Sequence, residues 1–362
     1  MINFSLNQLI IINLWMAYLL ISLVIFILLR RILITPYNLL YTICFTHYSK
    51  FLSNYLKTKD NKTSRVTHPV FSICRSAFED VLLLQINKLK GQKQKKLIEL
   101  YSSSGLLARR LKELESSSVW RRRNAIDRLS RSRSHDAVTG LLMALRDPDS
   151  AVKLIAVKAL GQVKATRAIP FIISLFKDFP EDKCVVIANT LIGFGASTAP
   201  YVLENLFSTE EKVRYWLLRT LAELPIRYHP GSQEYLRTFG RIETLTQSVS
   251  PRARAYAVFC LGQLPRSNQS FRSILPLLSD RAVFVRQKAT EACGNILDKR
   301  SLPYLIEKLG DHDWDVAEAA QDALFNFGRT ALRTVRKGLG SKKIIIREHC
   351  KSILSYFEGI HD

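Results

Sequence analysis

The stretch Asp147–Val163, with the sequence DPDSAVKLIAVKALGQV, decides the fold of this chain. Its Asp-Pro-Asp-Ser turn interrupts a preceding helix and supplies side-chain oxygens that can cap the next one. Gly161 lies where we expect the chain to turn out of that second helix. One apolar face recurs at helical spacing in each helix: Val138, Leu141, Leu142 and Leu145 in the first, and Val152, Ile155, Ala156, Ala159, Leu160 and Val163 in the second. Neither helix can bury this face alone, so the two-helix unit needs a neighbour on each side.

The same unit recurs along the chain. Aligning on the Gly161 position gives the anchors Ser130, Gly161, Gly193, Glu223, Gly262, Gly294, Asn326 and Ser355. Their spacings are 31, 32, 30, 39, 32, 32 and 29 residues, and a polar turn such as STEE or DHDW precedes most of them. A period near 31 residues with two helices per period predicts an all-α solenoid of about seven or eight repeats.

These repeats resemble the short bacterial HEAT repeats of phycobilisome lyases, with their D-x-D-x-x-V-R-x-x-A-x-x-A-L-G core. The residues that carry the resemblance are Asp147, Asp149 and Val152 with Lys153, Val213 with Arg214, Ala253 with Arg254, Val285 with Arg286, and Ile346 with Arg347. Gly105–Leu129 is similar to the leading segment of membrane-anchored bacterial HEAT-repeat proteins, which are often encoded beside glycosyltransferases. The resemblance covers about residues 98–362 and implies an armadillo-like fold. Ala317 stands where the pattern has Arg, so we expect a ladder of arginines to be interrupted there.

An uncharged run of 21 residues, Leu9–Leu29, precedes the repeats and ends at Arg30 and Arg31. As a helix it would span about 31 Å, which matches the hydrocarbon core of a bilayer. No basic residue precedes it and no small-residue cleavage site follows it, so an anchor is favoured over a signal peptide. The positive-inside rule then predicts a single-pass protein of a bacterial inner membrane, with a short N-terminus outside and the solenoid in the cytoplasm.

The remaining domain boundaries follow from composition. We expect an anchor at 1–31, an interfacial segment at 32–52, a basic helical connector at 53–117 and the HEAT-like solenoid at 118–362. Residues 32–48 are also uncharged, and a second span is the alternative to an interfacial helix. Residues 1–130 hold 20 Lys and Arg against 7 Asp and Glu, a surplus that suits anionic lipid headgroups near the connector. The six cysteines are scattered singly, which is typical of small buried hydrophobic residues.

Three groups of side chains are candidates for partner binding. The cluster Trp120, Arg121, Arg122 and Arg123 can clamp an acidic group, or can be a solvated helix face with its Trp packed on the first repeat. The 39-residue spacing contains an insertion, Pro225–Arg241, which we expect to project as a loop. It carries Arg227, Tyr228, Tyr235, Arg237 and Arg241. Trp314 either anchors a partner or packs between repeats.

We find no pattern that predicts catalysis or a bound cofactor. The GFGAST segment at Gly193–Thr198 lacks the Gly-Lys-Ser/Thr of a phosphate loop, so it is interpreted as a helix end and a cap. Asp311-His312-Asp313 falls in a turn, where acidic caps are favoured over metal ligands. We therefore expect no catalytic, cofactor or metal residues and no enzyme.

The leading hypothesis is a membrane-anchored scaffold whose cytoplasmic array binds a protein partner. The resemblance implies a membrane glycosyltransferase of envelope or exopolysaccharide synthesis as that partner. The alternatives are a nucleic-acid-binding protein similar to HEAT-like DNA glycosylases, which the net charge of +22 suggests, and a protein resembling bilin lyases. The juxtamembrane position of the charge makes nucleic acid the weaker hypothesis.

Overall fold

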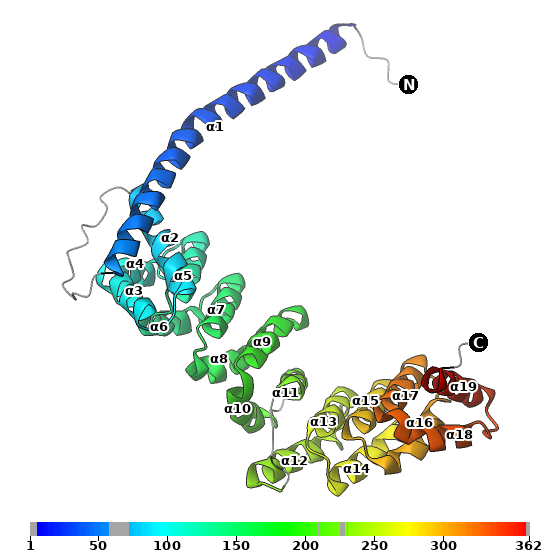
Figure 1. Cartoon of the computed structure of the whole chain (residues 1–362). Coiled ribbons are helices and arrows are strands. Elements are labelled where there is room, and N and C mark those ends of the chain that lie inside the picture. The colour runs from blue at the N-terminus through cyan, green and yellow to red at the C-terminus, as the bar shows by residue number, and fades with distance from the viewer. Residues whose placement is uncertain (1–5, 58–71, 209, 225–228, 230, 360–362) are drawn as a thin grey trace. The chain divides into compact units, whose positions relative to one another are not determined.

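The computed structural model describes residues 6–57, 72–208, 210–224, 229 and 231–359. Over these ranges the chain is almost entirely helical and contains no β-strand (Figure 1). It divides into two compact units, residues 1–144 and residues 145–362. The division falls inside the range 118–362 that the sequence assigns to repeats. The predicted all-α class is confirmed.

Unit 1 contains six helices among its described residues. They are α1 (Leu6–Tyr55), α2 (Ser72–Lys88), α3 (Gln92–Ser103), α4 (Leu106–Glu113), α5 (Val119–Ser132) and α6 (His135–Ala144). Residues 58–71, which belong to the predicted basic connector 53–117, lie outside the described residues.

Helix α1 is long and apolar enough to cross a membrane, by length and composition. Its large apolar side chains from Leu14 to Leu29 are each at least half exposed, so no part of the chain that the structure describes covers them. The helix runs without a break through Arg30 and Arg31 and past Pro36. Residues 32–48 therefore continue α1 and do not fold back as a second span.

The C-terminal part of α1 packs against α2 through residues that recur at helical spacing. Tyr41 donates a hydrogen bond of 2.7 Å to Asp80, the ring of Tyr48 lies 5.1 Å from that of Phe78, and Leu52 is fully buried. Burial and the hydrogen bond to Asp80 raise the pKa of Tyr41 to about 12, so its hydroxyl stays a donor. The helix that carries the apolar stretch is thus fixed to a folded unit.

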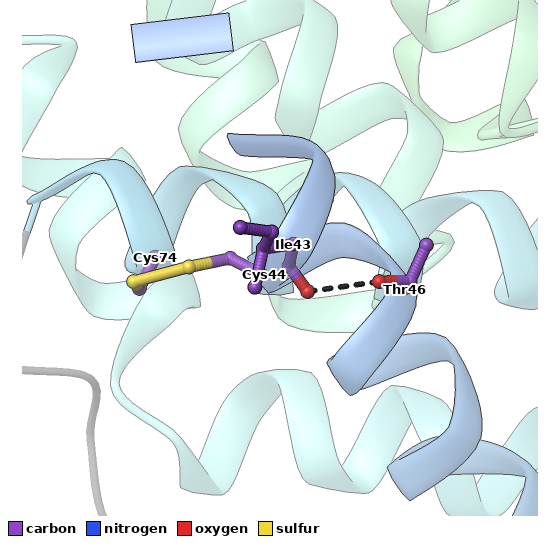
Figure 2. The surroundings of a disulfide bond; sticks show 4 residues. All are labelled: Ile43, Cys44, Thr46 and Cys74. Carbon is purple, nitrogen blue, oxygen red and sulfur yellow. Dashed lines mark hydrogen bonds between the residues drawn. A yellow bond between two sulfur atoms is a disulfide. The ribbon is translucent and has the colours of Figure 1, made fainter. Parts of the chain in front are cut away.

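A disulfide joins Cys44 of α1 to Cys74 of α2, with their Cα atoms 5.4 Å apart (Figure 2). The expectation of six single cysteines is therefore wrong for this pair. Sequence spacing could not reveal it, because 30 residues separate the two and only helix packing brings them together. The other four, Cys184, Cys260, Cys293 and Cys350, are free and buried as predicted.

A buried ionic network holds the rest of unit 1 together. Glu79 of α2 is fully buried and accepts hydrogen bonds from Arg110 of α4 at 2.8 Å and Tyr101 of α3 at 3.1 Å. Arg128 of α5 lies 3.5 Å from Glu79 and also pairs with Asp80. Burial lowers the pKa of Arg110, but the carboxylates of Glu79 and Glu113 more than offset this and raise it overall. Side chains from four helices therefore meet at the buried carboxylate of Glu79, and the arginines among them compensate its negative charge.

Unit 2 is a succession of helix pairs, often joined by short 3₁₀ turns. Its helices are α7 (Ser150–Gln162), α8 (Ile169–Ser174), α9 (Glu181–Gly193), α10 (Ala199–Asn205), α11 (Glu211–Glu223), α12 (Gln233–Leu245), α13 (Pro251–Gln263), α14 (Asn268–Ile274), α15 (Val283–Ile296), α16 (Leu302–Lys308), α17 (Trp314–Phe327), α18 (Leu332–Gly338) and α19 (Ile344–Glu358). The eight sequence anchors fall near the ends of α5, α7, α9, α11, α13, α15, α17 and α19. The period read from the sequence is therefore confirmed, and these odd-numbered helices are the second helices of the repeats.

Glycine at the anchor position serves close packing. A Cβ on Gly161 would lie 2.6 Å from Thr190 of the next second helix, and the backbone at Gly161 does not adopt a positive φ. Gly161 lies at the end of α7, as expected, but it is not the residue that takes the left-handed conformation there. Lys164, which has a φ of 54°, adopts the left-handed conformation just after α7 instead.

Two arginines of the repeat pattern each pair with an aspartate of the next turn and so form a ladder. Arg254 donates two hydrogen bonds to Asp280, at 2.8 and 2.9 Å, and Arg286 makes the same pair with Asp311 at 3.0 and 2.8 Å. Ala317, at the next position, is buried and has no charge to continue the series. The predicted interruption is confirmed.

Candidate interaction surface

The basic cluster at the start of α5 splits into two parts with different roles. Arg122 is 9% exposed and donates hydrogen bonds to the carbonyl oxygens of Ser116 and Ser117, so it caps its own turn. Arg121 and Arg123 face solvent, and Trp120 is 71% exposed. The alternative in which Trp120 packs on the first repeat is therefore wrong.

The candidate residues of the insertion lie in different environments. Arg227 and Tyr228 lie outside the described residues. Tyr235 is buried in α12, where its hydroxyl lies 3.0 Å from the Ser267 hydroxyl, so it is a core residue and not a docking residue. The second half of the insertion was expected to be a loop, but residues 233–241 belong to α12 because their apolar side chains are needed in the core.

Arg237 and Arg241 line a cavity of about 580 Å³ between α10 and α12. Arg241 already donates a hydrogen bond to the carbonyl oxygen of Leu203, whereas Arg237 is exposed. Glu204 and Glu234 also line this cavity, so its charges are mixed. The cavity therefore has no clear preference for an acidic or a basic ligand.

Trp314 begins α17 and is 70% exposed. The alternative of packing between repeats is therefore wrong, and the side chain is free to contact another molecule. Asp311 and Asp313 beside it serve as caps, as the sequence predicts: Asp311 accepts the Asp313 amide at 3.2 Å and Asp313 accepts the Asp315 amide at 3.1 Å. Across the described chain, no group of three or more His, Cys, Asp or Glu side chains is placed to hold a metal ion.

Three successive second helices form a groove of about 380 Å³ beside Trp314. We call it the α13–α15–α17 groove, and it is lined by Phe259, Gln263, Gln287, Glu291, Asn295, Asp315, Glu318, Ala319, Asp322, Ala323 and Asn326. It contains four carboxylates and no Lys or Arg, on a chain whose net charge is +22. The surface is therefore locally opposite in charge to the protein as a whole.

Most polar groups of this groove are available to a ligand. Glu291 pairs with Lys288 at 2.6 Å, but Asp315, Glu318 and Asp322 form no ion pair within the described residues. The side-chain amides of Gln263, Gln287, Asn295 and Asn326 likewise make no hydrogen bond in that part of the chain. Unpaired carboxylates and amides can accept hydrogen bonds from ammonium, guanidinium and peptide N–H groups.

A series of aromatic rings runs along the second helices α11, α13 and α15. The rings of Tyr215 and Tyr256 lie 5.0 Å apart, and Phe284 continues the series 5.7 Å from Tyr256. Phe259 lines the groove, with the ammonium of Lys288 4.9 Å above its ring. The groove therefore combines aromatic surface with hydrogen-bond acceptors.

Sequence reasoning missed this groove, although one signal was present. Residues 311–322 contain five acidic residues and no Lys or Arg, in a chain with 53 basic residues. That local inversion of charge marks α17. The contributions of α13 and α15 could not be recognised, because they depend on how the helices stack.

Comparison with known proteins agrees with this architecture. A family model described as HEAT repeats matches residues 107–186 and 240–324. No curated protein shows significant sequence similarity to the chain.

Solved structures of low sequence identity also match the chain. An engineered protein is 16% identical, with a TM-score of 0.38, covering 86% of this chain and 99% of its own. The Escherichia coli protein YIBA is 18% identical, with a TM-score of 0.41 and coverages of 77% and 96%. The CpcE–CpcF complex of phycocyanin lyase from Nostoc sp. PCC7120 is 14% identical, with a TM-score of 0.34 and coverages of 69% and 94%. The match to the family model shows that the chain contains HEAT repeats, and its described residues form an all-α, solenoid-like array with one N-terminal apolar helix.

Proposed function

We propose that this protein is a non-catalytic, membrane-anchored adaptor whose HEAT repeats bind a protein partner. The observation that carries the proposal is the α13–α15–α17 groove, with its unpaired carboxylates and amides beside the exposed Trp314. Repeat arrays of this kind bury each repeat only against its neighbours and leave the outer face of the second helices available for binding.

The groove favours a partner segment that carries Lys or Arg. Long basic side chains can lay their alkyl stems on Phe259 and Trp314 and direct their charged ends to Asp315, Glu318 and Asp322. The side-chain amides of the groove can form hydrogen bonds with the N–H and C=O groups of an extended partner segment. A nucleic acid is disfavoured at this surface, because its phosphates would face carboxylates.

In this proposal, α1 serves as the membrane anchor. Helix α1 exposes a continuous apolar surface and is fixed to unit 1, so insertion of α1 would hold the folded part close to the bilayer. The basic residues after Leu29 favour the cytoplasmic side, and exposed lysines such as Lys88, Lys90 and Lys93 suit anionic headgroups. The family resemblance suggests a membrane glycosyltransferase of envelope or exopolysaccharide synthesis as the partner, on the cytoplasmic face of a bacterial inner membrane.

The test measures binding of a fluorescent Lys/Arg-rich peptide to the full chain in mild detergent. We expect saturable binding that the double variant Glu318→Lys and Asp322→Lys weakens at least tenfold. The matched control is Glu204→Lys and Glu307→Lys, which changes the net charge equally on the first helices α10 and α16 and is expected to bind like the wild type. Equal loss in both variants would show that net charge alone is responsible and would contradict the proposal.

The partner itself is identified by crosslinking in membranes. A photoreactive amino acid at position 318 should capture a multi-span membrane protein, and one at position 307 should not. Tighter binding of duplex DNA than of the basic peptide, at physiological salt, would instead favour the nucleic-acid alternative.

A further inference from the structure

The contact between Cys44 and Cys74 lies where the anchor helix meets the folded unit (Figure 2). Cys44 is 13 residues beyond Arg31, about 20 Å further along an α-helix, and therefore clear of the predicted span. Cys44 is 8% exposed, and Cys74 is half-buried in the first turn of α2. A small thiol reagent can therefore reach Cys74.

The association of α1 with α2 does not depend on this bond. The hydrogen bond from Tyr41 to Asp80, the contact between the rings of Tyr48 and Phe78, and the buried Leu52 lie on the same face of α1. The two helices therefore keep their two sulfur atoms adjacent when the bond is open. A preformed pair of thiols can close again without a search through other conformations.

The other four cysteines do not compete for an oxidant. Burial raises the pKa of Cys293 to about 12 and that of Cys350 to about 11, and it also raises those of Cys184 and Cys260. All four are buried and are present as neutral thiols. We therefore expect oxidation at Cys44 and Cys74, which lie next to each other and of which Cys74 can be reached by a small reagent.

We propose that Cys44 and Cys74 form a reversible redox staple, which ties the anchor helix α1 covalently to α2 when closed and leaves the two helices held by packing alone when open. Closure is thiol–disulfide exchange with a low-molecular-weight disulfide of the glutathione class. The Cys74 thiolate attacks that disulfide and releases one thiol, and the Cys44 thiolate then displaces the second thiol and forms the Cys44–Cys74 bond. The two cysteines lose two protons and two electrons, and the reagent is reduced to two thiols. In the reducing cytoplasm proposed above, the pair is open at rest and closes under oxidation.

The first test follows the bond in the purified full chain in detergent. The protein is equilibrated in buffers of increasing ratio of oxidised to reduced glutathione, alkylated, unfolded and digested with trypsin. We expect a linked pair of peptides, Ile32–Lys50 with Val66–Arg75, that accumulates with oxidation and disappears on return to reduced glutathione. A pair that never links overturns the proposal, and so does a pair that stays linked in excess reduced glutathione.

The second test measures what the bond does. Closing a loop of about 30 residues should raise the Tm of the wild type by roughly 5–10 °C between reduced and oxidised buffer. Cys44→Ser should abolish the shift, whereas Cys260→Ser, which removes a buried single thiol, should retain it even if its Tm is lower in both buffers. A linked pair without any shift in Tm would show that the bond does not hold α1 more firmly than packing alone does, and would overturn that part of the proposal. Neither test uses the partner, so their outcome is independent of the adaptor function.

Discussion

Gly262 of α13 faces Ala292 of α15 so closely that a Cβ on Gly262 would lie 2.7 Å from both the Cα and the Cβ of Ala292. The same relationship recurs one repeat later, where a Cβ on Gly294 would lie 2.8 Å from the Cα of Ala323. Consecutive second helices thus approach each other through a small residue on each side. This contact explains why glycine stands at the anchor positions 262 and 294.

Gly262→Ala is therefore expected to destabilise the protein, although alanine favours helix formation. The added methyl group overlaps backbone as well as side-chain atoms of Ala292, so relief requires the two helices to separate. We expect a loss of about 1–3 kcal/mol in the free energy of unfolding, measured by chemical denaturation of the full chain in detergent.

Gly240→Ala is the matched control for this prediction. Gly240 also lies inside a helix, α12, but a Cβ there would meet nothing within 4 Å. We expect a gain of about 0.5–1 kcal/mol, because alanine restricts the unfolded chain. Equal destabilisation by both substitutions would mean that helix approach is not the reason for glycine at the anchor position.

Arg110→Ala should strongly destabilise unit 1. It leaves the fully buried carboxylate of Glu79 without its closest cation, and a buried charge that loses its partner typically costs about 3–5 kcal/mol. Arg109→Ala, on the same helix, removes only an exposed pair with Glu113 and should cost about 0.5 kcal/mol or less. Thermal unfolding of the two variants compares them directly, and similar Tm values would argue against the network as a core element.

The Arg–Asp ladder predicts loss of stability in acid. Burial raises the pKa values of Asp280 and Asp311, but hydrogen bonds from Arg254 and Arg286 and from backbone amides outweigh it and hold both below the usual value. A lowered folded pKa means that unfolding takes up protons. The two carboxylates therefore contribute their full stabilisation at pH values above the unfolded-state pKa of about 3.9. This stabilisation is lost as the pH falls from that value toward the pKa of the folded state.

The measurement is Tm as a function of pH between 6 and 3. The double variant Asp280→Asn and Asp311→Asn should be less stable than the wild type at pH 6, and the difference should shrink toward pH 3. Asp178→Asn, which alters an exposed residue outside the ladder, should leave the curve unchanged. A difference that stays constant with pH would contradict the assignment of these two carboxylates.

Trp314→Ala tests the edge of the α13–α15–α17 groove. Trp314 is 70% exposed, so its removal should change the free energy of unfolding by less than about 0.5 kcal/mol. It lies one turn from Glu318 on the same side of α17, and its loss should weaken binding of the basic peptide by about tenfold or more. Phe171→Ala, another exposed aromatic residue on the first helix α8, should not affect binding. Unchanged affinity in the Trp314 variant would remove this residue from the surface.

The sequence predicted the repeats well, because their signals are local. Helical spacing of apolar residues, turn chemistry and small residues at a fixed period all act within about 31 residues, and each of the eight anchors lies in a second helix. The insertion Pro225–Arg241 was predicted less well, because its second half is part of helix α12 and not of a loop. A loop and a short amphipathic helix differ mainly in where their apolar side chains are buried.

By itself, the sequence determined the all-α class, the repeat period, the apolar N-terminal helix and the interruption at Ala317. These depend on the order and spacing of residues along one chain. Only the tertiary structure decided that Cys44 meets Cys74, that Glu79 meets Arg110, and that three second helices combine into one acidic groove. Such contacts join residues far apart in sequence, and the packing of helices decides which of their faces come together.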